Sequence, residues 1–320
     1  MDASEGDPDA ERNPPEDAFG VLSHDLRLEV LRVLADAREP TSFAADPLPY
    51  SELAERVDTA DSGNFNYHLR TLRDGGFIER VRGGYRIRQA GVRIVRAIQA
   101  GTITDTEGFG RTEIDAACPY CDGQSAITLE DDWLFIVCLE CDGAFAQEAA
   151  LPDGTLAGFE VTPAGVQDRS PTDAFRMAYT LGERVHRLFA AGVCPDCGGT
   201  TTTDVLELCL EHDVGGTGTC GACGRTTDEY LVASCDVCGR SLMTFPAIVV
   251  AIDPQVIAVT YERGRDVTDG TWTVLSKPPD WPARYVRTDP TVIEYTIPVP
   301  DGEDVRARLD EELNVTVMNP

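Results

Sequence analysis

The sequence contains almost no lysine. Lys277 is the only one, although the chain of 320 residues carries 55 acidic residues and a formal net charge of −28. A surface rich in carboxylates and poor in lysine keeps a protein hydrated and soluble in concentrated salt. We therefore expect a halophilic protein.

Long apolar runs and catalytic motifs are also missing. The longest apolar stretch, near Phe245–Ile252, is too short to span a bilayer. The first fifteen residues are acidic and contain prolines, with no apolar segment of a signal peptide. We expect a cytoplasmic protein with no membrane contact. No His-Glu-x-x-His, glycine-rich phosphate loop or nucleophile elbow is present, so we do not expect an enzyme.

Cysteine, in contrast, is abundant and regularly spaced. Ten of the eleven cysteines form five Cys-x-x-Cys pairs, each followed by glycine within two residues. The pairs are Cys118/Cys121, Cys138/Cys141, Cys194/Cys197, Cys220/Cys223 and Cys235/Cys238. This pattern is typical of a zinc knuckle, in which backbone N–H groups face the thiolates and glycine is left-handed. In a reducing cytosol such pairs indicate metal ligands rather than disulfides.

The first two pairs predict one zinc ribbon over residues 117–160. Sixteen residues separate Cys121 from Cys138, and they include the strand-like runs 126–129 and 133–137. A hairpin this small cannot bury a core of its own, so four thiolates around Zn²⁺ would hold it closed. A rubredoxin-like iron centre and a redox dithiol are the alternatives.

The second set, over residues 192–245, allows two pairings. Cys194/Cys197 could join Cys220/Cys223 or Cys235/Cys238. We favour the outer pair, because runs 200–208 and 228–233 then form one hairpin with both knuckles at its base. The remaining set at the tip, Cys209, His212, Cys220 and Cys223, would hold a third zinc. The alternative is that Cys209 is a small buried hydrophobe and His212 faces solvent.

The residues before the cysteines predict helices and one hairpin. Leu22, Leu26 and Val30 begin a helical stripe with Ser23 as a possible N-cap, and a shorter helix fits 51–57. In the helix over 62–74, Phe65, Leu69 and Leu72 form a core stripe. Period-two alternation over 77–88 with a Gly-Gly turn predicts a hairpin, and a last helix fits 90–100.

Positive charge is concentrated in this region. Residues 64–96 contain eight arginines against Asp74 and Glu79, in a chain that is otherwise strongly acidic. Helix, helix, helix, hairpin and helix is the order of a winged helix-turn-helix, whose third helix enters the major groove of DNA. The predicted contacts from this helix and the wing are Asn64, Asn66, Tyr67, Arg70, Arg73, Arg80, Arg82 and Arg86. The alternative is a solvated basic face.

Two segments resemble a known family. Residues 19–31, FGVLSHDLRLEVL, are similar to the opening of the ArsR-type winged-helix regulators, and residues 66–78, NYHLRTLRDGGFI, resemble their recognition helix and its exit into the wing. The resemblance covers about residues 16–100. It implies a dimeric transcriptional regulator that binds double-stranded DNA. The whole arrangement, with cysteine modules after the winged helix, looks like regulators of halophilic archaea.

One departure from that family bears on sensing. Its metal sensors carry a Cys-x-Cys pair in the helix before the recognition helix, whereas residues 51–57, SELAERV, contain no thiol. Arsenic or cadmium sensing at that place is therefore excluded. His68 matches a family position, but beside Leu69 we interpret it as a packed, structural histidine.

The expected fold is α+β and multidomain. An acidic disordered tail (1–15) precedes the winged helix-turn-helix (16–100), a linker (101–116) and the first ribbon (117–160). A linker and helix (161–191, the helix near 172–191), the second ribbon (192–245) and an α/β segment (246–320) follow; within it a helix fits 253–263 and strands fit 283–317. The expected function is DNA-binding transcription regulation. The alternative is a protein-interaction module of the transcription machinery, in which the zinc modules bind a protein partner and the winged helix is a protein contact.

Overall fold

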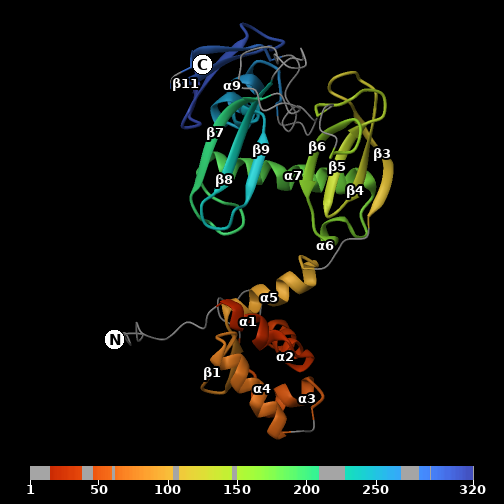
Figure 1. Ribbon diagram of the computed structural model, residues 1–320, viewed down its shortest axis with the longest axis vertical. Helices are drawn as coiled ribbons and strands as arrows, with labels where there is room; N and C mark the ends of the chain where they lie inside the picture. Colours follow the sequence, from red (N-terminus) through yellow and green to blue (C-terminus); the bar gives the residue numbers. More distant parts are fainter. Residues whose placement is uncertain are drawn as a thin grey trace. The chain divides into compact units, whose positions relative to one another are not determined.

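The computed structural model describes residues 15–37, 46–59, 62–103, 108–145, 150–208, 228–267, 281–288 and 290–319. Two compact units divide the chain, residues 1–104 and 105–320. Both mix helices with small antiparallel sheets (Figure 1). The disordered tail predicted at 1–15 lies outside the described residues except for Pro15, which begins the first helix. Within the described ranges, no helix combines the length and apolarity that crossing a membrane requires.

The first unit contains five helices and one hairpin in its described part. The elements are α1 (Pro15–Leu22), α2 (Asp25–Asp36), α3 (Tyr50–Arg56), α4 (Ser62–Asp74), β1 (Ile78–Val81), β2 (Gly84–Ile87) and α5 (Gln89–Ala100). The N-cap of α2 is His24, whose Nδ1 accepts the N–H of Leu26 at 3.2 Å. The expected cap, Ser23, is wrong, because its hydroxyl donates back to the Gly20 carbonyl at 2.8 Å.

The apolar stripe of helix α4 determines which side of the helix packs against the core. Phe65, Leu69 and Leu72 are buried, as the sequence predicts, and they share one core with Leu31 and Leu34 of α2. Leu53 of α3, Ile78 and Ile87 of the hairpin, and Val92 and Val95 of α5 complete this core. The opposite face of α4 is thereby left to solvent.

The hairpin is anchored by a close backbone approach. Its register pairs Ile78 with Ile87 and Val81 with Gly84. Leu48 lies beside β2 and forms an isolated antiparallel bridge with Tyr85. The two residues exchange two backbone N–H···O bonds of 2.9 Å. A Cβ on Gly84, whose φ is +153°, would lie 1.9 Å from the Leu48 oxygen. Only glycine fits there.

The described part of the second unit contains three antiparallel sheets. The first consists of β3 (Phe109–Ala117), β4 (Gln124–Glu130), β5 (Trp133–Cys138) and β6 (Thr155–Glu160). The second consists of β7 (Thr201–Leu208), β8 (Asp228–Cys235) and β9 (Ser241–Thr244). The third consists of β10 (Ala283–Thr288), β11 (Thr291–Ile297), β12 (Val305–Asp310) and β13 (Val315–Val317).

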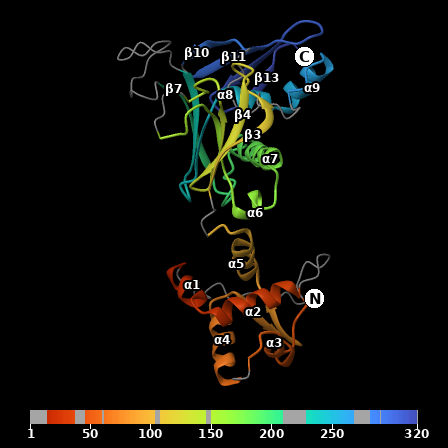
Figure 2. The ribbon, with the colours of Figure 1, turned by 90° about the vertical axis from the view of Figure 1, so that its right-hand side faces the viewer.

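Four helices among the described residues connect and cover these sheets. They are α6 (Pro163–Val166), α7 (Pro171–Ala190), α8 (Pro246–Ala251) and α9 (Pro254–Glu262). Helix α7 packs on the β3–β6 sheet, while α8 and α9 contact β12 (Figures 1 and 2). The helices expected near 172–191 and 253–263 correspond to α7 and α9. Asp253 caps α9 by accepting the N–H groups of Gln255 and Val256.

One hydrophobic core joins the parts of this unit. It includes Leu134 and Ile136 of the first sheet, Leu231 of the second and Ile297 of the third. All residues of α8 are buried in it. The segments expected as successive modules after residue 116 therefore pack around a common interior. The linker predicted over residues 101–116 is wrong from residue 109 onward, because β3 begins at Phe109 and pairs with β4.

Candidate metal centres and nucleic-acid interface

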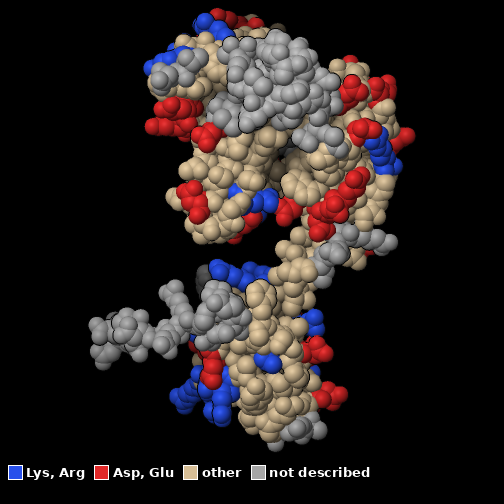
Figure 3. All heavy atoms as spheres, viewed as in Figure 1, with Lys and Arg blue, Asp and Glu red and all other residues tan. Residues whose placement is uncertain are grey.

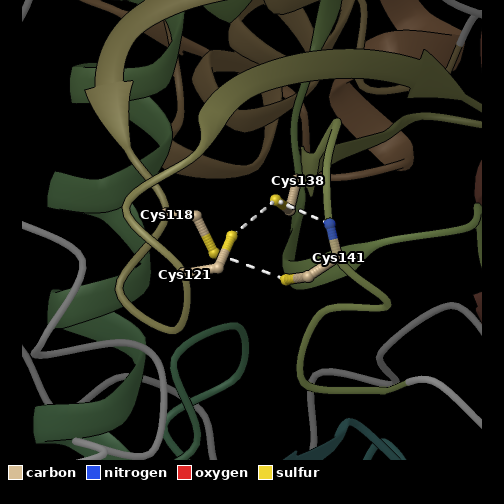
Figure 4. A group of neighbouring side chains, drawn as sticks. All are labelled: Cys118, Cys121, Cys138 and Cys141. Atoms are coloured by element: carbon tan, nitrogen blue, oxygen red, sulfur yellow. Dashed lines mark hydrogen bonds between the residues drawn. The ribbon is translucent and has the colours of Figure 1, made fainter.

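Four cysteines of the first sheet meet at its edge. Cys118 and Cys121 lie in the turn after β3, and Cys138 and Cys141 at and beyond the end of β5, with their sulfur atoms turned toward one another (Figure 4). The Sγ atoms of Cys118 and Cys141 are 3.7 Å apart, and those of Cys121 and Cys138 are 3.5 Å apart. Zn–S bonds of about 2.3 Å in a tetrahedron place sulfurs about 3.8 Å apart. The group therefore has the size of a metal site.

Backbone N–H groups surround these sulfurs. Cys138 Sγ accepts from the N–H groups of Glu140 and Cys141, both at 3.3 Å, and Cys118 Sγ from Tyr120 at 3.5 Å. The turn after Cys141 uses a left-handed Gly143 (φ +72°), as predicted. After Cys121 the left-handed residue is Asp122 (φ +58°) and not the expected Gly123, whose open side is covered by the Glu140 side chain.

The thiols of Cys118 and Cys141 resist ionisation. Burial raises the pKa of Cys118, and it raises that of Cys141 to about 12. For Cys138 burial also raises the pKa, but the N–H groups of Glu140 and Cys141 outweigh it, and the net shift is downward. Metal binding requires thiolates, and a divalent cation among them offsets their mutual repulsion. The donor set fits such a cation.

A second group forms at the base of the β7–β8 hairpin. Cys194 and Cys197 follow α7, while Cys235 and Cys238 close β8. The Sγ distances are 3.6 Å for Cys194–Cys238 and 3.5 Å for Cys197–Cys235. The structure thus brings together the outer pairs, as favoured from the sequence. The N–H groups of Cys238 and Val237 lower the pKa of Cys235 to about 7.

Within the described residues, these two groups of four cysteines are the ones whose ligand atoms approach closely enough to hold a metal ion. The third set proposed from the sequence lies outside the described residues. Its members are Cys209, His212, Cys220 and Cys223.

The predicted contacts on α4 lie on its solvent side. Asn64, Asn66, Tyr67, Arg70 and Arg73 are exposed. The amide of Asn66 donates to the Tyr50 hydroxyl at 3.4 Å, which connects α4 with α3. The side chains expected to meet base edges and phosphates therefore share one face.

The hairpin carries the other predicted contacts. Arg80 and Arg82 are exposed and Arg86 is half-buried, and Figure 3 shows basic side chains gathered over the β1–β2 hairpin. Arg86 pairs with Glu79 at 2.6 Å, and Arg80 lies 6.0 Å from the centre of the Tyr85 ring.

Ion pairs leave much of this basic surface available. Arg73 pairs with Asp74 at 2.8 Å, and both side chains are exposed. Such a pair contributes about 0–1 kcal/mol, so its arginine can change partner at little cost. Neither Arg70 nor Arg82 forms an ion pair with a described residue.

His68 points away from this face. It is buried, neither ring nitrogen has a hydrogen-bond partner among the described residues, and its ring lies 4.2 Å from that of His24. This is the packed, structural histidine that the sequence suggested. Sequence reasoning missed a different pair, Arg240 and Glu160, which are hydrogen-bonded in the second unit. No local motif joins residues 80 positions apart.

Two family models match this chain. One, described as a domain of unknown function (DUF7351), matches residues 115–315. The other, a domain of unknown function (DUF7347), matches residues 15–98. Neither the curated proteins nor the solved structures contain a match to the sequence.

Proposed function

The chain belongs to the DUF7351 family, whose model matches more than half of it, and we propose that it is a sequence-specific DNA-binding transcriptional regulator. The first unit acts as a winged helix-turn-helix. Helix α4, residues 62–74, enters the major groove, and the wing, residues 77–88, lies on the phosphate backbone.

The observation that carries this proposal is the placement of arginines in an acidic chain. Arg70 on α4 and Arg82 at the tip of the hairpin are exposed and form no ion pair with a described residue. A chain of net charge −28 gains nothing in solubility from a basic patch. The phosphate groups of DNA are a partner whose negative charge such a patch complements.

The acidity of the remaining chain does not oppose this role in concentrated salt. At about 1 M salt the Debye length is about 3 Å, so distant carboxylates are screened from the duplex. Contacts within van der Waals distance, such as an Asn–adenine or Arg–guanine pair, persist under those conditions.

The two cysteine groups act as structural zinc centres in this proposal. The supporting features are four thiol donors per group, sulfur spacings of 3.5–3.7 Å and N–H donors on the sulfurs. Thiolate-saturated sites leave no open position for catalysis. The homodimer implied by the ArsR resemblance would present two α4 helices to half-sites about 34 Å apart.

Fluorescence anisotropy tests DNA recognition. Genomic fragments selected by the purified protein at about 1 M salt are titrated with wild type, with Arg70→Ala/Arg82→Ala, and with Arg96→Ala. We expect the double variant to lose at least about tenfold in affinity. Arg96→Ala, which removes an exposed arginine from α5, is the matched control and should lose less. Unchanged affinity in the double variant would contradict the proposal and favour a protein contact by this unit.

A further inference from the structure

The second unit contains a cavity of about 800 Å³. Its walls come from β5 and β6 of the first sheet, from α7, and from the turn after Cys238 that leads into β9. Figure 3 shows the surface hollowed between the two sheets on this side. The volume lies in the range of sites for small organic molecules.

One wall of the cavity is aromatic. Trp133 and Phe135 alternate along β5, and their ring planes differ by only 19°, with centroids 6.2 Å apart. Gly158 pairs with Phe135 across the sheet, and a Cβ added there would lie 3.0 Å from Phe135 Cε1 and 3.3 Å from Trp133 Cε3. Both rings therefore reach over β6 at the position that has no side chain. The two near-parallel rings form an apolar platform.

Apolar side chains on three walls of the cavity remain in contact with solvent. Trp133 of β5 is 41% exposed, Leu181 of α7 39% and Met243 of β9 44%, and all three line the cavity. Removing such surface from water is favourable, so its collection around one hollow indicates an apolar occupant. The flexible thioether of Met243 can adapt to the outline of that occupant.

The charged side chains of the cavity are paired with one another. Among the described lining residues they are Glu160, Asp196 and Arg240. Arg240 donates through Nη1 to Glu160, and its buried Nε lies 3.6 Å from an Asp196 oxygen. Two carboxylates against one guanidinium leave a net negative charge, which disfavours an anionic ligand. A cationic ligand would compete with Arg240 for both carboxylates.

The imidazole of His186 also has its partners within the protein. Its Nδ1 lies 2.7 Å from the Gly182 carbonyl, and its Nε2 lies 2.9 Å from the Thr244 hydroxyl. Burial lowers the pKa of His186, so its ring is neutral at pH 7. Neither His186 nor Arg240 is left to receive a charged group, and a charge that enters without a partner loses its hydration uncompensated.

We propose that this cavity binds a small, planar aromatic molecule without a formal charge. Its ring system lies against Trp133 and Phe135, because aromatic rings favour offset-stacked and edge-to-face contacts. Leu181 and Met243 contact its remaining surface. Binding is a property of the second unit alone. Only the use of the site by an effector that alters DNA recognition rests on the proposed function.

Calorimetry with probes of one shape tests the preference for a neutral ligand. The full-length protein, with its metal content verified, is titrated with 2-naphthamide, 2-naphthoate and 2-naphthylmethylamine. We expect the neutral amide to bind at least about tenfold more tightly than either charged probe, because the charged groups lose their hydration. A smaller preference, or no heat with 2-naphthamide up to about 1 mM, would overturn the proposal.

A saturated probe tests the preference for a flat ring system. Decahydronaphthalene-2-carboxamide has the same amide and a similar size, but its rings are puckered. We expect 2-naphthamide to bind at least about threefold more tightly, since the puckered rings cannot stack on Trp133 and Phe135. Equal or tighter binding of the saturated amide would overturn the assignment of an aromatic ligand.

Variants locate the binding. Leu181→Trp fills the cavity from a partly exposed position and should weaken 2-naphthamide at least about tenfold. Val286→Trp adds the same indole at an exposed position of β10 outside the lining of the cavity, and it should leave binding unchanged. If Leu181→Trp fails to fold, Trp133→Leu serves instead, because it keeps an apolar side chain but removes the flat ring, and it should weaken binding at least about threefold.

Unchanged binding of 2-naphthamide in the folded cavity variant would overturn the assignment. Equal weakening in Val286→Trp would do the same, because it would place the probe outside the cavity. No DNA is present in these titrations, so failure of the proposed function leaves their results unaffected.

Discussion

The sulfur atoms of Cys197 and Cys235 lie 3.5 Å apart, although 38 positions separate the two residues in the chain. Between them run β7 and β8, in a register that pairs Thr201 with Cys235. The contact therefore closes the hairpin at its base. It also connects the end of α7 with the strand that carries Leu231 into the common core.

Replacing one of these ligands should release one metal ion. We expect Cys197→Ser to lower the bound metal, counted by native mass spectrometry, by one ion per chain. A structural zinc contributes on the order of 10 kcal/mol in small domains, but here the shared core retains part of the fold. We expect the unfolding free energy to fall by about 3–5 kcal/mol.

Cys121→Ser is the matched variant at the other centre. It should also release one ion, and the double variant two. An unchanged count in either single variant would contradict the assignment of that group as a metal centre.

The hairpin of the first unit should depend on Gly84. Gly84→Ala forces a Cβ to within 1.9 Å of the Leu48 oxygen at a φ of +153°. The bridge to Leu48 must open, and we expect a loss of about 2–3 kcal/mol in urea unfolding together with weaker DNA binding. Gly20→Ala is the control, since it has open space at ordinary φ in α1 and should be neutral or stabilising. Equal effects of the two changes would refute the strain argument.

Acid should destabilise the first unit through His68. Burial, then the charges of His24 and Arg27, lower the pKa of His68. Between the ordinary value of about 6.5 and the lower folded value, the unfolded chain binds a proton that the folded chain does not. The unfolding free energy is therefore complete above about pH 6.5 and falls as the pH is lowered through that window.

His68→Phe should remove this contribution. We expect the wild type to lose more stability than the variant between about pH 7.5 and about pH 5.5 in urea titrations of the full chain. Both proteins carry the same cysteine groups, so their acid sensitivity cancels in the difference. Parallel pH profiles would show that His68 does not contribute.

A buried carboxylate should stabilise the last sheet. Glu294 of β11 is buried and accepts from Arg284 at 2.6 Å and from Arg308 at 2.8 Å. Hydrogen bonds from Arg284, then from Arg308, lower the pKa of Glu294. Its contribution is present above the ordinary carboxyl pKa and is lost as the pH falls through the lower folded value.

Glu294→Gln should therefore reduce stability. Both arginines are partly exposed, so we expect only about 1 kcal/mol at neutral pH in urea unfolding. Glu303→Gln, at an exposed position in the loop before β12, is the control and should have no measurable effect. An unchanged free energy of unfolding in Glu294→Gln would mean that solvent completely screens both ion pairs of Glu294.

Local patterns in the sequence predicted much of this structure. The stripe of Phe65, Leu69 and Leu72 predicted α4, and Cys-x-x-Cys spacing with strand runs between the pairs predicted both groups of four thiols. Such signals lie within a few turns or one hairpin, where a residue's neighbours in sequence are also its neighbours in space.

Long-range relationships were not predictable in this way. Strand β3, expected as a linker, has Ile114 as its only fully buried residue, and it is an edge strand that depends on β4 for pairing. The contact of Arg240 with Glu160, and the cavity beside it, exist only after two sheets pack across α7. The sequence around Arg240 carries no pattern that predicts a contact with Glu160, and the sequence around Glu160 carries none that predicts Arg240.

The burial of every residue of α8 has an evolutionary consequence. The second unit is not a series of interchangeable modules, since removing the polypeptide after residue 245 would take α8 and the third sheet out of the core that Cys118 and Cys138 share. We expect a fragment that ends at residue 245 to fold poorly, because much of this core is missing from it. We expect the stretch from β3 to β13 to be inherited as one unit, and one family model spans most of it, residues 115–315.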